Sequence, residues 1–174
     1  MWFGSSTAFD EEIRRRFETL IAAAAREELA QWEQTAQSCV SLVIVLDQFP
    51  RNVYHDTAAA FAHDEHALGL TKRAVAAGYL PALSVPERVF LLMPYQHVED
   101  AATQREGMAL FERVCDDAPE WREFAENTLQ FARRHLEIIE RFGRFPHRNR
   151  ALGRISSAEE QEYLDSNPDA FGQG

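Results

Sequence analysis

The segment PYQHVED, residues 94–100, gathers side chains that could carry out acid–base chemistry. If the chain is helical there, His97 and Asp100 lie one turn apart and in register with Gln104, so the three side chains face the same way. A single inward histidine is usually a hydrogen-bonded core residue, but histidine titrates near neutral pH and a carboxylate can fix its tautomer. For an enzyme, we therefore expect His97 with Asp100, or else the inward-facing His135, as general acid or base.

A second group of candidate residues is basic. The stretch 141–154 contains no acidic residue, in a chain whose formal net charge is −10, and it holds five arginines: Arg141, Arg144, Arg148, Arg150 and Arg154. The planar guanidinium group binds carboxylates and phosphates through two parallel hydrogen bonds. These arginines therefore either pair with carboxylates elsewhere in the fold or bind an anionic ligand. The obvious internal partners lie on otherwise apolar faces, where charges are rarely buried unpaired: Asp47, Asp64 and Asp100.

Two segments resemble each other, DQFPRN at 47–52 and GRFPHRN at 143–149. Each is expected to end an apolar helix with Phe-Pro, because proline cannot continue the backbone hydrogen bonding. The arginine and asparagine that follow can donate to the last free carbonyl groups of the helix, which is a purely structural role. The alternative is that both segments contribute to a ligand site.

Several classes of protein are disfavoured by the sequence. A pI near 5.1 argues against a nucleic-acid binder, and no window of about 18 apolar residues predicts a membrane span. Cys39 and Cys115 have no metal-type spacing and fit reduced thiols of a cytoplasmic protein without a signal peptide. The motifs HExxH, CxxC, GxSxG, the phosphate loop and the dinucleotide fingerprint are missing, so we expect no metal and no cofactor.

Helical periodicity dominates the chain and predicts one all-α domain over residues 1–174 with about seven helices. Residues 39–49 are almost continuously apolar and could be a strand, but their length and the lack of a partner strand favour a buried helix. Ser84 with Glu87 and Asp117 with Glu120 predict capping boxes. Residues 167–174 read as a loose tail. The expected helices cover 10–29, 39–49, 56–78, 84–94, 99–115, 117–143 and a short last segment capped by Ser156 with Glu159 or Ser157 with Glu160.

The longest predicted helix carries a stripe of residues at alternating spacings of three and four. This spacing predicts a continuous buried face that ends at Gly143 and includes His135, and its members are Trp121, Phe124, Thr128, Phe131, His135, Ile138 and Phe142.

The ordered motifs Trp2-Phe3-Gly4, DQFPRN, the stretch 61–64, PYQHVED with Gln104, His135 followed by RFGRFPHRN, and SSAEEQEYL cover nearly the whole chain. In these motifs the sequence resembles the bacterial family known as domain of unknown function 924. The chain departs from that pattern at Val98, at His55 and in a shorter segment between Gly4 and Asp10. The resemblance implies a tetratricopeptide-like right-handed helical superhelix without an established activity, and it points to Asp47, Gln48, Arg51, Asn52, His97, Glu99, Asp100, His135, Arg144, His147, Arg148 and Asn149.

Two hypotheses for the function follow. In the first, the helix ends near residues 49 and 142 converge with the His97 turn to form a pocket for a small anionic ligand, with hydrolase or transferase activity on a phosphate or carboxylate ester. The anion would be held by Arg51, Arg144 and Arg148, and these would be oriented by Asp47, Asn52 and Asp100. In the second, the protein is a helical module that binds a peptide or protein, and the polar residues are structural. A pocket requires an accessible opening, whereas a structural network requires the groups to satisfy one another.

Overall fold

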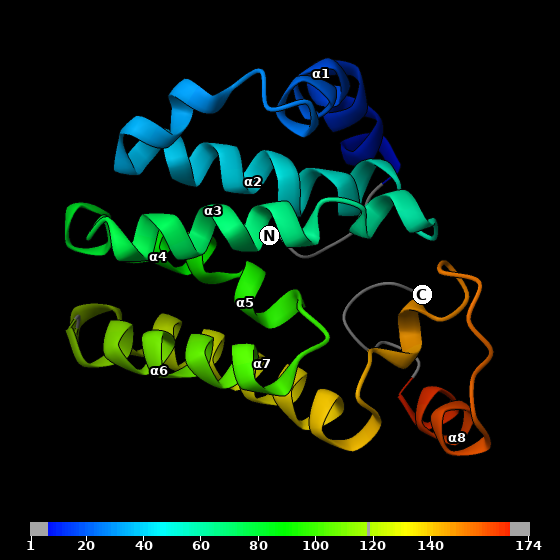
Figure 1. Ribbon diagram of the computed structural model, residues 1–174. Helices are drawn as coiled ribbons and strands as arrows, with labels where there is room; N and C mark the ends of the chain where they lie inside the picture. Colours follow the sequence, from blue (N-terminus) through cyan, green and yellow to red (C-terminus); the bar gives the residue numbers. More distant parts are fainter. Residues whose placement is uncertain (1–6, 118, 168–174) are drawn as a thin grey trace.

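The computed structural model describes residues 7–117 and 119–167, and every regular element in these ranges is a helix (Figure 1). Among the described residues, seven α-helices have eight residues or more, and α5 has four. The α-helices are α1 (Thr7–Ala25), α2 (Ala36–Val53), α3 (Asp64–Ala76), α4 (Val85–Leu92), α5 (Pro94–His97), α6 (Ala101–Asp117), α7 (Arg122–Phe142) and α8 (Ala158–Ser166). Short 3₁₀ turns join them at η1 (Ala30–Gln34), η2 (Ala58–Phe61), η3 (Leu80–Ala82), η4 (Pro119–Trp121) and η5 (Pro146–Arg148).

The helices stack on one another in layers, with α2 and α3 running across the view in Figure 1. The helix α2 contacts α1 on one side and α3 and α4 on the other, while α6 pairs with α7 at the opposite end (Figure 1). The all-helical prediction is confirmed, whereas the tetratricopeptide-like superhelix and the single domain stay predictions. The tail predicted from residue 167 and the Trp2-Phe3-Gly4 motif lie, apart from Asn167, outside the described residues.

The apolar core has two main parts. One surrounds α2, where the segment predicted as a buried helix places Val43 and Leu46 almost wholly out of solvent. The other lies between α4, α5, α6 and α7 and includes Tyr95 and Phe111. The prediction of a buried helix and not a strand around residue 43 is therefore confirmed. A helix that is buried on several sides needs little polar surface, which explains the nearly continuous apolar run.

Several predicted helix boundaries need correction. Proline does not end α2 at residue 50, since the helix continues through Pro50 to Val53. Pro50 lies in the last turn, so its missing N–H removes one hydrogen bond close to a helix end rather than in the middle. The third helix begins at Asp64 instead of residue 56 or 57, where Asp56 has a left-handed φ of 61°. The longest helix was expected to begin at Asp117 but begins at Arg122, and Asp117 is instead the last residue of α6.

Other local predictions are confirmed. The Ser84–Glu87 and Ser157–Glu160 capping boxes both form. Gly143 ends α7 with a φ of 69°, the left-handed conformation that glycine adopts without a Cβ clash. No helix among the described residues is both long and apolar enough to cross a membrane.

The buried stripe predicted on α7 is only partly correct. Thr128, His135 and Ile138 are buried, but Trp121, Phe124 and Phe131 keep 44, 38 and 42% of their surface exposed. The buried face instead uses smaller and aliphatic residues one position along the helix, at Ala125, Leu129, Ala132 and Ile139. Spacings of three and four residues occur on two adjacent faces of α7, so the sequence does not distinguish them. The packing of α7 against α6 determines which of the two faces is buried.

Candidate functional site

Asp47 and His97 form the centre of the candidate site. Asp47 lies on the buried face of α2 and has no exposed surface. His97 ends α5, and its ring Nδ1 is 2.7 Å from Asp47 Oδ1. The same carboxylate accepts a hydrogen bond from Gln48 Nε2 at 2.5 Å and pairs with an Arg51 guanidinium nitrogen at 3.2 Å. Both carboxylate oxygens therefore have partners, as a buried charge requires.

The electrostatics of this pair keep Asp47 ionised and His97 neutral. Burial by itself would raise the pKa of Asp47, but Arg51 and His97 more than offset burial and hold that pKa well below its usual range. Burial lowers the pKa of His97, and the Arg51 guanidinium lowers it further against the opposing effect of Asp47. Because an ionised carboxylate can only accept, Nδ1 of neutral His97 carries the proton. Nε2 is then the basic atom of the ring.

The position of His97 depends on the packing of α5 against α6. Gln104 on α6 donates from its side-chain amide to the carbonyl groups of Gln96 at 3.0 Å and Val98 at 2.7 Å, on either side of the histidine. Tyr95 lies so close to Gly107 that a Cβ at residue 107 would be 2.3 Å from the tyrosine Cβ. Only glycine permits this approach, so α6 holds the short α5 turn in place.

Asp64, the first residue of α3, lies between two arginines. Arg51 Nη2 donates to both of its carboxylate oxygens at 2.9 and 3.0 Å, and Arg148 Nη1 donates to Oδ2 at 3.0 Å. The guanidinium carbon of Arg148 is 4.5 Å from the ring centroids of both Phe61 and Phe145. Asp64 therefore links α2, α3 and η5. An inner cluster is thus formed by five side chains: Asp47, Arg51, Asp64, His97 and Arg148.

Two further histidines lie beside the inner cluster. The ring centroid of His135 is 6.0 Å from that of His97 and 5.6 Å from that of Phe145. Its Nδ1 donates to the Phe131 carbonyl at 2.8 Å. Burial lowers the pKa of His135 to about 3, with a further contribution from His97, and burial beside Arg148 lowers the pKa of His147 to about 3. Both rings are therefore neutral at pH 7.

A second network fixes the segment between α7 and α8. Arg154 makes a bidentate pair with Glu99 at 2.6 and 2.9 Å, and Glu99 also accepts from the Phe145 backbone N–H at 2.8 Å. Arg144 makes a bidentate pair with Glu160 at 2.6 and 2.8 Å. The name outer network is used for these four charged residues together with the buried Asn149, which contacts Arg154 and Glu160. The outer network holds η5, and with it Arg148, against the inner cluster.

The predicted site residues thus divide into separate groups. The structure brings together Asp47, Gln48, Arg51, His97, His135, His147 and Arg148, and it places Glu99, Arg144 and Asn149 in the outer network. Asn52 instead donates to Asp10 at 3.0 Å and ties α2 to α1.

Asp100 is not the carboxylate partner of His97, so that expectation was wrong. Its Oδ1 accepts from the Thr103 backbone N–H at 2.7 Å at the start of α6, and its side chain is exposed. The chain leaves helical geometry at Val98, with a ψ of 142°, and the one-turn register between His97 and Asp100 is lost there. A carboxylate 50 residues away, on α2, takes the expected place.

Four arginines of the 141–154 stretch pair internally, as one of the two sequence interpretations held. The partners are Glu159 for Arg141, Glu160 for Arg144, Asp64 for Arg148 and Glu99 for Arg154. Arg144 consequently lies outside the inner cluster and is not placed to share an anion with Arg51 and Arg148. The sequence had pointed to Asp64 through its apolar face and to Arg154 through the basic stretch, but Phe61 and Glu160 were missed as members of the site because nothing local marks their distant partners.

Parts of the inner cluster reach solvent and parts are incompletely hydrogen-bonded. The side chains of His97 and Arg51 are each 13% exposed, and that of Asp64 is 16% exposed. Within the described part of the chain, buried Arg148 Nε and Gln104 Oε1 have no hydrogen-bond partner. Leaving a buried donor unpaired costs free energy, so Arg148 Nε is a candidate contact for a ligand acceptor atom.

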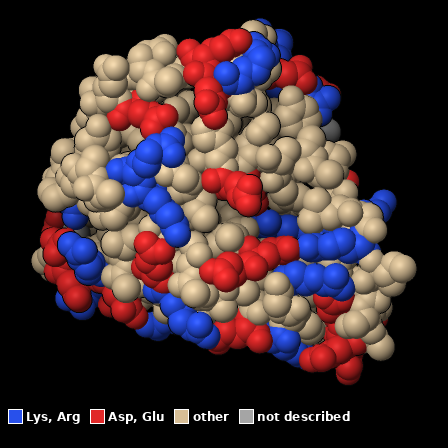
Figure 2. Space-filling model, viewed as in Figure 1, with Lys and Arg blue, Asp and Glu red and all other residues tan. Residues whose placement is uncertain are grey.

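The charge distribution contains no large patch of one sign on the face shown in Figure 2, where acidic and basic side chains alternate. The described residues also contain no group of three or more His, Cys, Asp or Glu placed to hold a metal ion. The inner cluster itself has two carboxylates and two guanidinium groups. Its formal charge is balanced when His97 is neutral, so a ligand would be recognised through directed hydrogen bonds rather than through excess charge.

Comparisons with known proteins give the relationships of the chain. A family model described as "Bacterial protein of unknown function (DUF924)" matches residues 1–168. A solved structure, that of the protein of unknown function ATU0120 from Agrobacterium tumefaciens, is 39% identical in sequence with a TM-score of 0.81. The match covers 95% of this chain and 88% of the other. No curated protein matched the sequence.

Proposed function

The chain belongs to the bacterial DUF924 family, and for this member we propose an enzyme in which the Asp47–His97 pair is the general base. The observation that carries the proposal is the 2.7 Å contact between the buried Asp47 carboxylate and His97 Nδ1. A base oriented by a third group in this way is the common arrangement for activating water or a hydroxyl nucleophile. The carboxylate fixes the ring and stabilises the imidazolium that forms when Nε2 accepts a proton.

The substrate class that fits is a small ester with an anionic group, either a phosphate or a carboxylate. Arg148 Nε is a buried donor without a partner in the described chain, and the partly exposed Arg51 lies beside it across Asp64. An anionic oxygen could take the unmet donor of Arg148, while His97 Nε2 removes a proton from the attacking water or alcohol. Attack on the ester carbon or phosphorus breaks the bond to the leaving alkoxide, which takes the proton back from His97 Nε2 and departs as the alcohol. The reaction is hydrolysis when water attacks and transfer when another alcohol attacks.

The test compares wild type with His97→Asn on a panel of p-nitrophenyl phosphate and carboxylate esters that carry a second anionic group. The asparagine amide can still donate to Asp47 from near the position of Nδ1, but it has no basic atom in place of Nε2. We expect at least one ester to be hydrolysed by wild type and the rate to fall roughly 100-fold or more in the variant, the usual contribution of general base catalysis.

The pH profile separates a base from a structural residue. The wild-type rate should rise with pH through a midpoint below 6.5, because the pKa of His97 is lowered, and then level off. No turnover of the whole panel, or equal turnover by a folded His97→Asn protein, would refute the catalytic proposal.

We infer a second candidate function, self-association, from the exposed aromatic residues on α7. Phe124 and Phe131 lie two turns apart on α7. The two residues are equally far along the helix from the point midway between residues 127 and 128. Two antiparallel copies of α7 would therefore place Phe124 against Phe131 of the second copy. Trp121 would then face the Arg134 of that copy, a cation–π arrangement that Arg134 already makes with Phe131 within the chain.

Light scattering during size-exclusion chromatography tests this candidate. A dimer that becomes monomeric in Phe131→Glu but persists in Gln130→Glu, a control on an exposed neighbouring position of α7, is the expected result. A wild-type protein that stays monomeric at high micromolar concentration would dismiss self-association. The helix face would then be left for a different protein partner.

A further inference from the structure

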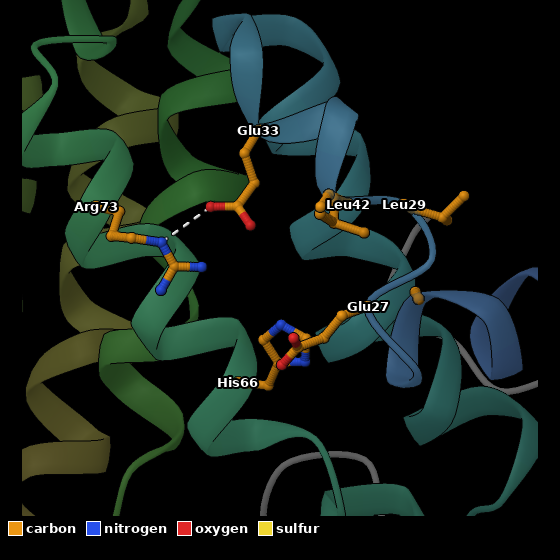
Figure 3. A pocket seen from close by; sticks show the side chains of 8 residues that line it. Glu27, Leu29, Glu33, Leu42, His66 and Arg73 are labelled. Atoms are coloured by element: carbon orange, nitrogen blue, oxygen red, sulfur yellow. Dashed lines mark hydrogen bonds and ion pairs between the residues drawn. The ribbon is translucent and has the colours of Figure 1, made fainter.

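A hollow of about 270 Å³ lies away from the inner cluster, where α1, η1, α2 and α3 meet (Figure 3). Its apolar lining comes from Ala24, Leu29, Ala30 and Leu42, of which Ala24 and Leu42 belong to the buried core. This volume is roughly that of nine water molecules, since each occupies about 30 Å³ in liquid water. A hollow of this size with an apolar floor can take a small organic molecule.

The polar side chains at the hollow are two glutamates, an arginine and a histidine. Glu33 and Arg73 pair with each other, with 2.9 Å between Oε2 and Nε, and Figure 3 shows Glu27 and His66 on the side away from Glu33. The Glu27 side chain makes no hydrogen bond or ion pair with another described residue, although its charge helps to raise the pKa of the nearby Arg73. The two glutamates and the one arginine leave one formal negative charge at the opening, and Glu27 is the carboxylate that makes no direct contact with the arginine.

The backbone at Glu27 supplies an independent observation. Glu27 has a φ of 60°, in the left-handed region that side chains with a Cβ rarely adopt. Its N–H donates to Ala24 at 3.0 Å, and the Glu28 N–H donates to Ala23 at 3.1 Å, the pattern that closes a helix and normally places glycine at this position. A glutamate here costs stability that glycine would not, and the same residue holds the unpaired carboxylate at the hollow.

We propose that this hollow binds a small primary amine with a short aliphatic stem. The ammonium group contacts Glu27, with His66 as a neighbouring acceptor, and the stem covers Leu29 and Leu42. The unmatched negative charge disfavours a simple carboxylate or phosphate, and the apolar floor disfavours a bare metal ion. The site does not depend on the proposed chemistry at His97, which lies on α5, outside the lining of the hollow.

The experiment measures thermal unfolding with millimolar n-pentylamine, using n-pentanol and pentanoate as probes of the same stem without the positive charge. A ligand that binds only the folded state raises the unfolding midpoint. We expect a saturable rise with the amine that is absent or much smaller with the alcohol and the acid. His97→Asn should show the same rise, so failure at one site does not imply failure at the other.

The decisive variants are Glu27→Gly and Asp56→Gly. Asp56 is also left-handed, with a φ of 61°, but it does not line the hollow, which makes it a matched control. Both changes relieve the same backbone cost and should raise the midpoint without ligand by roughly 2–4 °C. Only Glu27→Gly should lose the response to pentylamine, and Glu27→Gln, which removes only the charge, should lose it too. A response of equal size in wild type, Glu27→Gly and Glu27→Gln, or an equal response to pentanoate, would overturn the proposal.

Discussion

The Asp47 carboxylate on α2 meets Nδ1 of His97 on α5 at 2.7 Å, across 50 residues of sequence. Asp47 is fully buried, whereas the His97 side chain keeps 13% of its surface exposed. The pair therefore has a protected carboxylate at one end and a histidine near solvent at the other. This arrangement is suited to a base whose tautomer is fixed from within the protein.

Asp64→Asn should strongly destabilise the fold, because the amide leaves Arg51 and Arg148 without the negative charge between them. Removal of one partner from a buried ion pair costs about 3–5 kcal/mol, and the loss here should fall towards the lower end of that range because the Asp64 side chain is 16% exposed. Urea unfolding measures the change, and Glu65→Gln at the exposed neighbouring position is the control. The double variant Asp64→Asn with Arg148→Met should recover part of the loss, since it also removes a buried positive charge. A loss below about 1 kcal/mol in the single variant would contradict the buried arrangement.

Stability should fall as the pH is lowered from 6.5 towards 4.5. The pKa of His135 and that of His147 are about 3 in the folded protein, below the ordinary value of 6.5 that applies when the chain unfolds. The unfolded chain therefore binds protons in this range that the folded chain does not, at up to about 1.4 kcal/mol per pH unit for each histidine.

Urea midpoints at a series of pH values test this slope. His135→Gln should reduce it by up to about 1.4 kcal/mol per pH unit, whereas His55→Gln, at an exposed position, should leave it unchanged. The stabilising effect of a neutral buried histidine is complete above pH 6.5 and decreases below it. A midpoint that does not change between pH 6.5 and 4.5 would show that these rings are protonated in the folded state or exposed.

Gly107→Ala should disrupt the approach of α6 to α5, since the new Cβ would lie 2.3 and 2.8 Å from Tyr95 Cβ and Cγ. The backbone must shift, with a cost of about 1–3 kcal/mol. Gly69→Ala is the matched control in the middle of α3, where the nearest atom is the flexible end of Arg73 at 3.4 Å. It should be stabilising by roughly 0.5–1 kcal/mol. Equal effects of the two alanines on thermal unfolding would count against the close packing that positions His97.

Glu99→Gln should loosen the segment between α7 and α8 more than it affects the rest of the chain. The change removes the charge that Arg154 binds in a bidentate pair and weakens the acceptor for the Phe145 N–H. Amide hydrogen exchange should accelerate over residues 144–157 and remain near wild type in α2. Uniform acceleration in both regions would mean that the outer network is part of the global fold and not a local fixture for Arg148.

The helical composition of the fold could be predicted because it depends on local spacing. The apolar run around Val43 and the Ser157–Glu160 capping box are examples in which neighbours in sequence determine the structure. The aromatic side of α7 could not be assigned, because Phe131 and Ala132 point to adjacent faces and only the packing of α6 selects between them.

The site could be predicted as a set of residue types but not as a set of contacts. His97, Asp47 and Arg148 were each identified from charge or burial pattern. The pairs that they form, His97 with Asp47 and Arg148 with Asp64, depend on where α2, α3, α5 and η5 meet in space, which no local rule gives. The expectation of Asp100 as the partner of His97 followed from helical register, and it failed where the chain becomes extended at Val98.

The tautomer of His97 is the most direct test of the central claim, and long-range ¹H–¹⁵N NMR of the imidazole ring measures it. At pH 7 we expect a neutral ring with the proton on Nδ1 and an unprotonated Nε2, because the ionised Asp47 accepts from Nδ1. Asp47→Asn should shift the population towards the other tautomer, provided the variant remains folded. A wild-type ring that is doubly protonated at pH 7, or one that carries its proton on Nε2, would contradict the assignment of Asp47 and His97 as a general base.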